Sequence, residues 1–136
     1  MKVLICGEQT NFDPKEVGEA LEHHGLKPEV IITTAETDLE KYVINWCNDN
    51  GVKHKTQAID WSNTDVEGAV IRTSKYGQEY NARAAFQRNE QLVLESDAVL
   101  HLHNHNRTTN SIVEEAEKTE TQVFTWPVCE EEDIPF

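Results

Sequence analysis

The stretch 81-NARAAFQRNEQLVLESDAVLHLHNHNRTTNSIVEEAEK-118 decides how this chain folds. It begins with an amphipathic run over 82–95, passes into the apolar segment 98–102 and opens into a polar loop over 103–109. A second helical pattern follows over 109–118. A helix, a buried strand, a polar loop and a helix in this order are typical of one unit of an open α/β sheet. In such sheets ligands bind in the crevice beyond the carboxyl ends of the strands.

Four further segments have the character of strands. The continuous apolar run KVLIC over 2–6 ends at Gly7 and suits a strand buried on both faces. Residues 28–32 and 122–126 are also predicted strands, and 52–58, in which lysines and a histidine alternate, is a predicted edge strand. Because helices separate these strands, we expect a Rossmann-like α/β fold with a mainly parallel five-stranded sheet. Helices should cover both faces, and the strand at 98–102 should be central.

Two of the helices carry clear start signals. Asp13 is a natural N-cap, Pro14 suits the first helical position, and Glu16 would complete a capping box. The second helix is expected to begin near Thr37, with Glu40 as its capping-box partner. These helices would lie over 13–25 and 37–50.

The segment Asp60–Tyr80 shows little periodicity and is predicted to be an irregular loop or lid beside the site. Trp61, Tyr76 and Tyr80 could stack there on a nucleobase or, equally, anchor the loop to the core. We expect a single domain over 1–127, followed by an acidic tail over 128–136.

Composition excludes some classes of partner. Of 136 residues, 25 are acidic and 12 are basic, which gives a net charge of −13. A general binder of duplex nucleic acid or of anionic membranes needs a positive field, so neither is expected. Cys6, Cys47 and Cys129 are odd in number and form no CxxC motif, which favours a reduced, cytoplasmic setting. No signal peptide or membrane-spanning segment is predicted.

The residues expected in the crevice have side chains suited to an anionic, nucleotide-like small molecule. Arg88 could grip phosphate or ribose as a fork, with Asn89 beside it; alternatively, Arg88 is a surface residue paired with Glu90 or Glu95. Hydroxyl and imidazole groups at the ends of two strands could complete the site. The predicted ligand-binding residues are Gly7, Thr33, Thr34, Arg88, Asn89, His103, His105, Arg107, Thr108 and Thr109.

Alternating histidines mark the end of the strand at 98–102. His101, His103 and His105 would share a face if the strand continued, and imidazoles spaced in this way can bind zinc or nickel. No fourth ligand is placed by spacing, so the favoured interpretation is that His101 is a hydrogen-bonded core residue. His103 and His105 would then line the crevice, and no metal or other cofactor is predicted.

Carboxylates near the first two strand ends are candidates for catalysis. Glu8 and Glu36 could stabilise positive charge or activate water in the hydrolysis of a glycosidic bond. Asp38 and Glu40 are explained by the start of a helix, where acidic side chains complement the helix dipole.

These features together resemble the SLOG superfamily, a Rossmann-like group that includes the LOG-type phosphoribohydrolases. The resemblance covers about residues 1–126 and rests on MKVLICG, on Asp60–Trp61, and on Arg88–Asn89 before the Asp97 strand. It is closest to a small, single-domain bacterial and phage branch. The resemblance implies a nucleotide-like ligand and a homo-oligomer with the pocket built across a dimer interface.

Both glycine loops of that family are missing from this sequence. Thr33–Asp38 stands where relatives carry a GGARGAD-like loop, and His105–Thr109 replaces a GG-x-GT loop. Those glycines let the backbone approach phosphate closely, and threonine resists the positive φ they adopt. We therefore expect binding, as a sensor or sequestering protein, without efficient turnover. The alternatives are a hydrolase that cleaves an N-glycosidic or phosphoester bond of a nucleotide, and an acidic protein-interaction scaffold.

Overall fold

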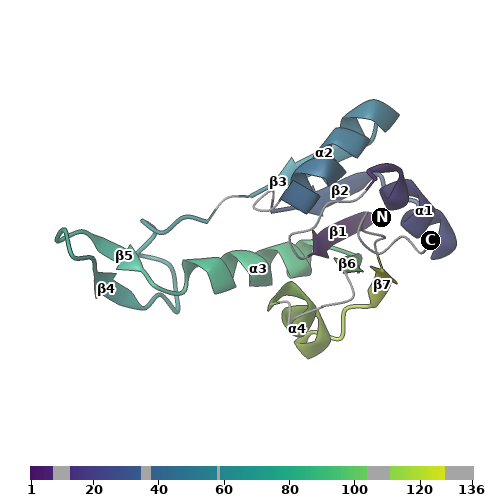
Figure 1. Cartoon of the computed structure of the whole chain (residues 1–136). Helices are drawn as coiled ribbons and strands as arrows, with labels where there is room; N and C mark the ends of the chain where they lie inside the picture. The colour runs from purple at the N-terminus through teal and green to yellow at the C-terminus, as the bar shows by residue number, and fades with distance from the viewer. Residues whose placement is uncertain (8–12, 35–37, 58, 104–110, 128–136) are drawn as a thin grey trace, which may run out of the picture.

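The computed structural model describes residues 1–7, 13–34, 38–57, 59–103 and 111–127. Within these residues five strands form one all-parallel sheet in the order β3-β2-β1-β6-β7 (Figure 1). The strands are β1 (Lys2–Gly7), β2 (Val30–Thr33), β3 (Lys53–Thr56), β6 (Ala98–His103) and β7 (Val123–Pro127). The predicted Rossmann-like α/β fold is confirmed, and so is the position of β3 as an edge strand.

The middle of the sheet is β1 rather than the strand at 98–102. β1 pairs with β2 on one side and with β6 on the other, and β6 lies between β1 and β7. Both strands are apolar and buried on both faces, so burial alone does not distinguish the central strand from its neighbour. The chain reverses its direction of progress between β1 and β6, which makes their carboxyl ends the topological switch point of the sheet.

Two helices cover each face of the sheet. Helices α1 (Lys15–His23) and α2 (Asp38–Asn50) contribute to the core cluster that contains Val3, Ile5 and Leu100. Helices α3 (Ala84–Glu95) and α4 (Ser111–Lys118) pack on the opposite face against Leu4 and Val99. Figure 1 shows the two pairs on opposite sides of the strands. No helix of the described segments is long and apolar enough to cross a bilayer.

The segment predicted to be irregular contains an antiparallel hairpin of β4 (Ile71–Thr73) and β5 (Glu79–Asn81). Ser74 closes the turn with hydrogen bonds to Gln78 and Gly77, and Gly77 has a φ of +83°. Strands of three residues are too short for alternation to reveal them in sequence. Figure 1 shows the hairpin projecting beyond the amino-terminal end of α3, away from the sheet. We call residues 66–83 the arm.

The start of α1 differs by one residue from the start that the sequence predicts. The N-cap residue of α1 is Pro14 rather than Asp13, and it makes no side-chain capping hydrogen bond. Asp13 lies one residue earlier, where its Oδ1 accepts a hydrogen bond from the backbone N–H of Lys15 at 3.1 Å. The thiols of Cys6 and Cys47 are buried and form no disulfide within the described residues, and desolvation raises the pKa of Cys47 to about 11. A thiol with that pKa is protonated at neutral pH and is a poor nucleophile.

Candidate functional site

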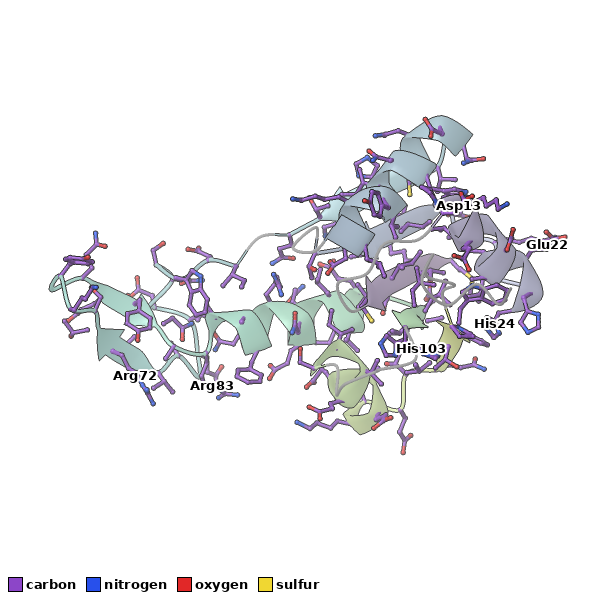
Figure 2. The ribbon with its side chains drawn as sticks, in the orientation of Figure 1. Asp13, Glu22, His24, Arg72, Arg83 and His103 are labelled. Carbon is purple, nitrogen blue, oxygen red and sulfur yellow. The ribbon has the colours of Figure 1, made fainter. Side chains whose placement is uncertain are left out.

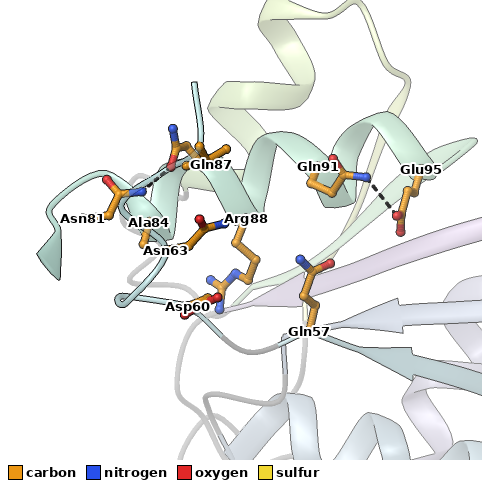
Figure 3. Close-up of a pocket in the computed structure, with 10 residues that line it drawn as sticks. Gln57, Asp60, Asn63, Asn81, Ala84, Gln87, Arg88, Gln91 and Glu95 are labelled. Carbon is orange, nitrogen blue, oxygen red and sulfur yellow. Dashed lines mark hydrogen bonds between the residues drawn. The ribbon is translucent and has the colours of Figure 1, made fainter. Parts of the chain in front are cut away.

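A polar pocket of about 320 Å³ lies between α3 and the segment that leaves β3 (Figure 3). Its described lining residues come from the segment that follows β3, from β5 and from α3. Neutral amides dominate its wall, together with one guanidinium and two carboxylates. The lining residues are Gln57, Asp60, Asn63, Val66, Asn81, Ala84, Gln87, Arg88, Gln91 and Glu95.

Arg88 is the cation of this pocket and is only 6 % exposed. Its Nη2 and Nε donate to Oδ1 of Asn89 at 2.9 and 3.2 Å, and Nδ2 of Asn89 donates to Oγ of Ser111 at 3.1 Å. This chain of hydrogen bonds ties the guanidinium to the first residue of α4. Figure 3 shows the guanidinium of Arg88 directed toward Asp60 across the pocket. A buried arginine held in this way is a preorganised donor for an anion or a carbonyl.

Hydrogen bonds to the arm fix the amide wall of the pocket. Asn81 is 1 % exposed, and its Nδ2 donates to Oε1 of Gln87 at 2.6 Å. Its Oδ1 accepts from the backbone N–H groups of Arg83 and Val70 at 3.0 and 3.3 Å. Asn81, the last residue of β5, therefore joins the start of α3 to Val70, the residue before β4. The geometry of this wall depends on the arm being folded.

Glu95 closes the other end of the pocket and is held as a carboxylate. Its Oε2 accepts from Nζ of Lys55 at 2.7 Å, and its Oε1 accepts from Nε2 of Gln91 at 3.0 Å. The hydrogen bond from Lys55, followed by that from Gln91, lowers the pKa of Glu95. A general acid needs a pKa near the working pH, so Glu95 is suited to binding or structure rather than to proton donation.

Thr33 and Thr34, two predicted ligand-binding residues, lie at the end of β2 and are 0 % and 6 % exposed. Both hydroxyls donate to Oε2 of Glu40, from Thr33 at 3.0 Å, and the backbone N–H of Thr34 donates to the same oxygen at 2.9 Å. Glu40 is itself buried at 4 % exposure. The structure therefore shows these threonines bound to a carboxylate of the protein.

Gly7 ends β1 at a point of very close packing. A Cβ placed there would lie 2.3 Å from the carbonyl oxygen of Leu102 and 2.9 Å from a methyl group of Leu39. The glycine is needed because β6 and α2 approach the backbone, whether or not a ligand does so as well.

The histidines of β6 share a face, as the strand pattern predicts. His101 is 2 % exposed, His103 is partly exposed, and their ring centroids are 5.6 Å apart. No group of three or more histidine, cysteine or acidic side chains that could hold a metal ion occurs in the described part of the chain.

The aromatic residues of the arm region separate into two roles. Trp61 and Tyr80 meet edge to face at 6.5 Å between centroids and line a second pocket of about 340 Å³. Tyr76 lies in the hairpin turn, is 83 % exposed and stays near Nζ of Lys75. Tyr76 therefore does not anchor the segment to the core.

Of the predicted site residues, Arg88 alone lines the described polar pocket; Asn89 contacts it through the guanidinium. Sequence reasoning missed the amides of Gln57, Asn63 and Asn81, which have no characteristic spacing. The remaining candidates lie outside the described residues: Glu8, Glu36, His105, Arg107, Thr108 and Thr109.

Comparison with known proteins gives no further guide. No known protein family matches the sequence, and no curated protein is significantly similar to it.

Proposed function

We propose that this protein binds a nucleotide or nucleotide-derived small molecule in the pocket beside α3 and holds it without efficient turnover. The observation that carries the proposal is the buried guanidinium of Arg88, held by Asn89 on the wall of a polar pocket. Arginine presents a planar set of donors that matches phosphate oxygens or the carbonyl edge of a base.

The amides of the pocket suit the rest of such a ligand. Side-chain amides both donate and accept, so Gln57, Asn63 and Gln91 can pair with base edges or ribose hydroxyls. A volume of about 320 Å³ is at the small end of typical ligand sites. The resemblance to the SLOG superfamily and the strand order of the sheet add a fold-level analogy.

Two carboxylates, Glu95 in the pocket and Glu40 outside it, favour binding over turnover. Glu95 has a lowered pKa and two hydrogen-bond donors, and Glu40 is occupied by Thr33 and Thr34. Neither carboxylate is arranged to deliver a proton to a leaving group. The glycine loops that would supply backbone donors in the resembling enzymes are also missing from the sequence.

A second candidate is a nucleotide hydrolase, and one observation favours it. Asp60 lies in the same pocket as Arg88, and Figure 3 shows the two side chains facing each other. A carboxylate opposite an anion-binding guanidinium could activate water or stabilise positive charge on a sugar. Changing Asp60 to asparagine would then abolish turnover while ligand binding remained.

A thermal-shift screen tests the proposal against nucleoside monophosphates and diphosphates, cyclic nucleotides and ADP-ribose. We expect at least one to raise the melting temperature, and chromatography after denaturation to recover it intact. Release of free base and ribose phosphate that depends on Asp60 would overturn the binding-only account in favour of the hydrolase. Absence of any shift across the panel would contradict nucleotide binding itself.

A further inference from the structure

The arm differs in charge from the rest of this acidic protein. Residues 66–83 contain three basic and two acidic side chains, whereas the rest of the chain contains nine basic and 23 acidic ones. Arg72 and Lys75 are exposed, and Arg72 makes no ion pair within the described residues. Figure 2 shows Arg72 and Arg83 at the opposite end of the molecule from Glu22 and His24. The arm is thus a basic projection on a strongly negative body.

The hairpin also has an open edge. The N–H of Ser74 donates to Gln78, and the N–H of Ala82 donates to Val70. Hydrogen-bonded pairs alternate along an antiparallel ladder, so the pair Arg72–Tyr80 is of the same kind. The backbone groups of Ile71 and Thr73 therefore point away from β5, and among the described strands none pairs with them.

Apolar side chains in and beside β4 are exposed. Val70, just before β4, and Ile71, its first residue, are 40 % and 45 % exposed. A two-stranded hairpin is marginally stable alone, and an exposed edge readily accepts a further strand. The arm therefore offers backbone, apolar and basic groups to an extended acidic segment.

The chain itself contains a segment of that chemistry. Glu130, Glu131, Glu132 and Asp133 form its densest acidic run, and Ile134 and Phe136 follow. We propose that residues 130–136 of one copy dock along β4 on the arm of a second copy. Strand β7, which precedes this segment in the sequence, is drawn well apart from the arm in Figure 1, and the pairing is therefore proposed between two copies. Direct pairing of two β4 strands about their centre is disfavoured because it would place Arg72 opposite its own equivalent.

Sedimentation of the full-length protein tests this proposal by charge reversal. Arg72→Glu with Lys75→Glu on the arm, or Glu130→Lys with Glu132→Lys on the acidic segment, should each weaken self-association about tenfold or more. A mixture of the two variants should recover association, because the reversed charges again complement each other. Lys27→Glu with Lys118→Glu makes the same charge change elsewhere and should leave association nearly unaltered. Association should also weaken as salt rises.

Three results would overturn the proposal. One is a protein that stays monomeric up to high micromolar concentration, and another is association that neither reversal weakens. The third is failure of the mixed variants to recover. Tight, arm-dependent binding of a labelled single-stranded oligonucleotide by a monomeric protein would assign the arm to nucleic acid instead. Circular dichroism of each variant confirms that the fold is retained.

Discussion

Residues that could bind a ligand lie in two regions of this protein, and the two regions differ in what surrounds those residues. At the ends of β1 and β2, Gly7 is enclosed by Leu102 and Leu39, while Thr33 and Thr34 donate to Glu40. Beside β3, amides and Arg88 surround an open pocket of about 320 Å³. A polar residue at a strand end is thus a weak guide to a ligand when another side chain can satisfy it. A buried cation on the wall of a pocket is a stronger one.

The largest effect is expected from Gly7→Ala, which tests whether close packing fills the space at the end of β1. The new methyl group would overlap the carbonyl of Leu102, so strand or helix must shift and the free energy of unfolding should fall by about 3 kcal/mol. Urea unfolding measures this. Gly77→Ala in the hairpin turn is the matched control, because its Cβ meets nothing within 4 Å and only its positive φ is strained. If both variants lose the same small amount, the packing account of Gly7 is wrong.

Removal of the carboxylate at Glu40 is the next test. Glu40→Ala leaves the donors of Thr33 and Thr34 buried without that acceptor and should cost about 2 kcal/mol of stability. Glu19→Ala on the exposed side of α1 should be nearly neutral by the same denaturation measurement. A stable Glu40→Ala protein that binds nucleotide more tightly would mean that the threonines are ligand groups after all.

The third test lies on the pocket side. Arg88→Ala should weaken nucleotide binding by about 2 kcal/mol, roughly thirtyfold in Kd, because a charge-assisted hydrogen bond is lost. Arg88 is buried, so the variant should also be less stable, and Arg88→Lys separates the two effects by keeping the charge without the fork. Arg83→Ala, an exposed arginine just before α3, is the control in titration calorimetry. Equal affinities for all four proteins would remove Arg88 from the site.

The smallest effect concerns the ion pair at the end of the pocket. Glu95 has a lowered pKa in the folded state, so its stabilising contribution is full above the ordinary value of 4.5 and is lost as pH falls through the folded value. Lys55→Ala should reduce stability by about 0.5 kcal/mol at pH 7, because Lys55 is half exposed and solvent screens the pair. The difference from the unaltered protein should shrink toward pH 3. A difference that is independent of pH would show that Lys55 acts through packing.

Strands β1 and β6 could be predicted from the sequence because both are buried on both faces of the sheet. The runs KVLIC at β1 and AVLHL at β6 are apolar without alternation, which is what a strand covered on both faces requires. The hairpin β4–β5 was not readable, because its strands are three residues long and mostly exposed, with no apolar face to repeat. Of the residues that line the pocket, Arg88 alone was predicted from the sequence to bind a ligand. Half of the lining residues are neutral amides, which come from the segment after β3, from β5 and from α3, and amides at such spacing carry no pattern.

Side-chain amide signals in a ¹H–¹⁵N spectrum test the central claim most directly. During titration with nucleotides from the panel, the account predicts saturable shifts in the NH₂ resonances of Gln57, Asn63 and Gln91. The side-chain NH₂ resonances of Asn45, Asn48 and Asn50 on α2 should not shift, since these residues lie outside the pocket. Shifts confined to the backbone of Gly7, Thr34 and His103, with the pocket amides unmoved, would contradict the account and place the ligand at the switch point of the sheet.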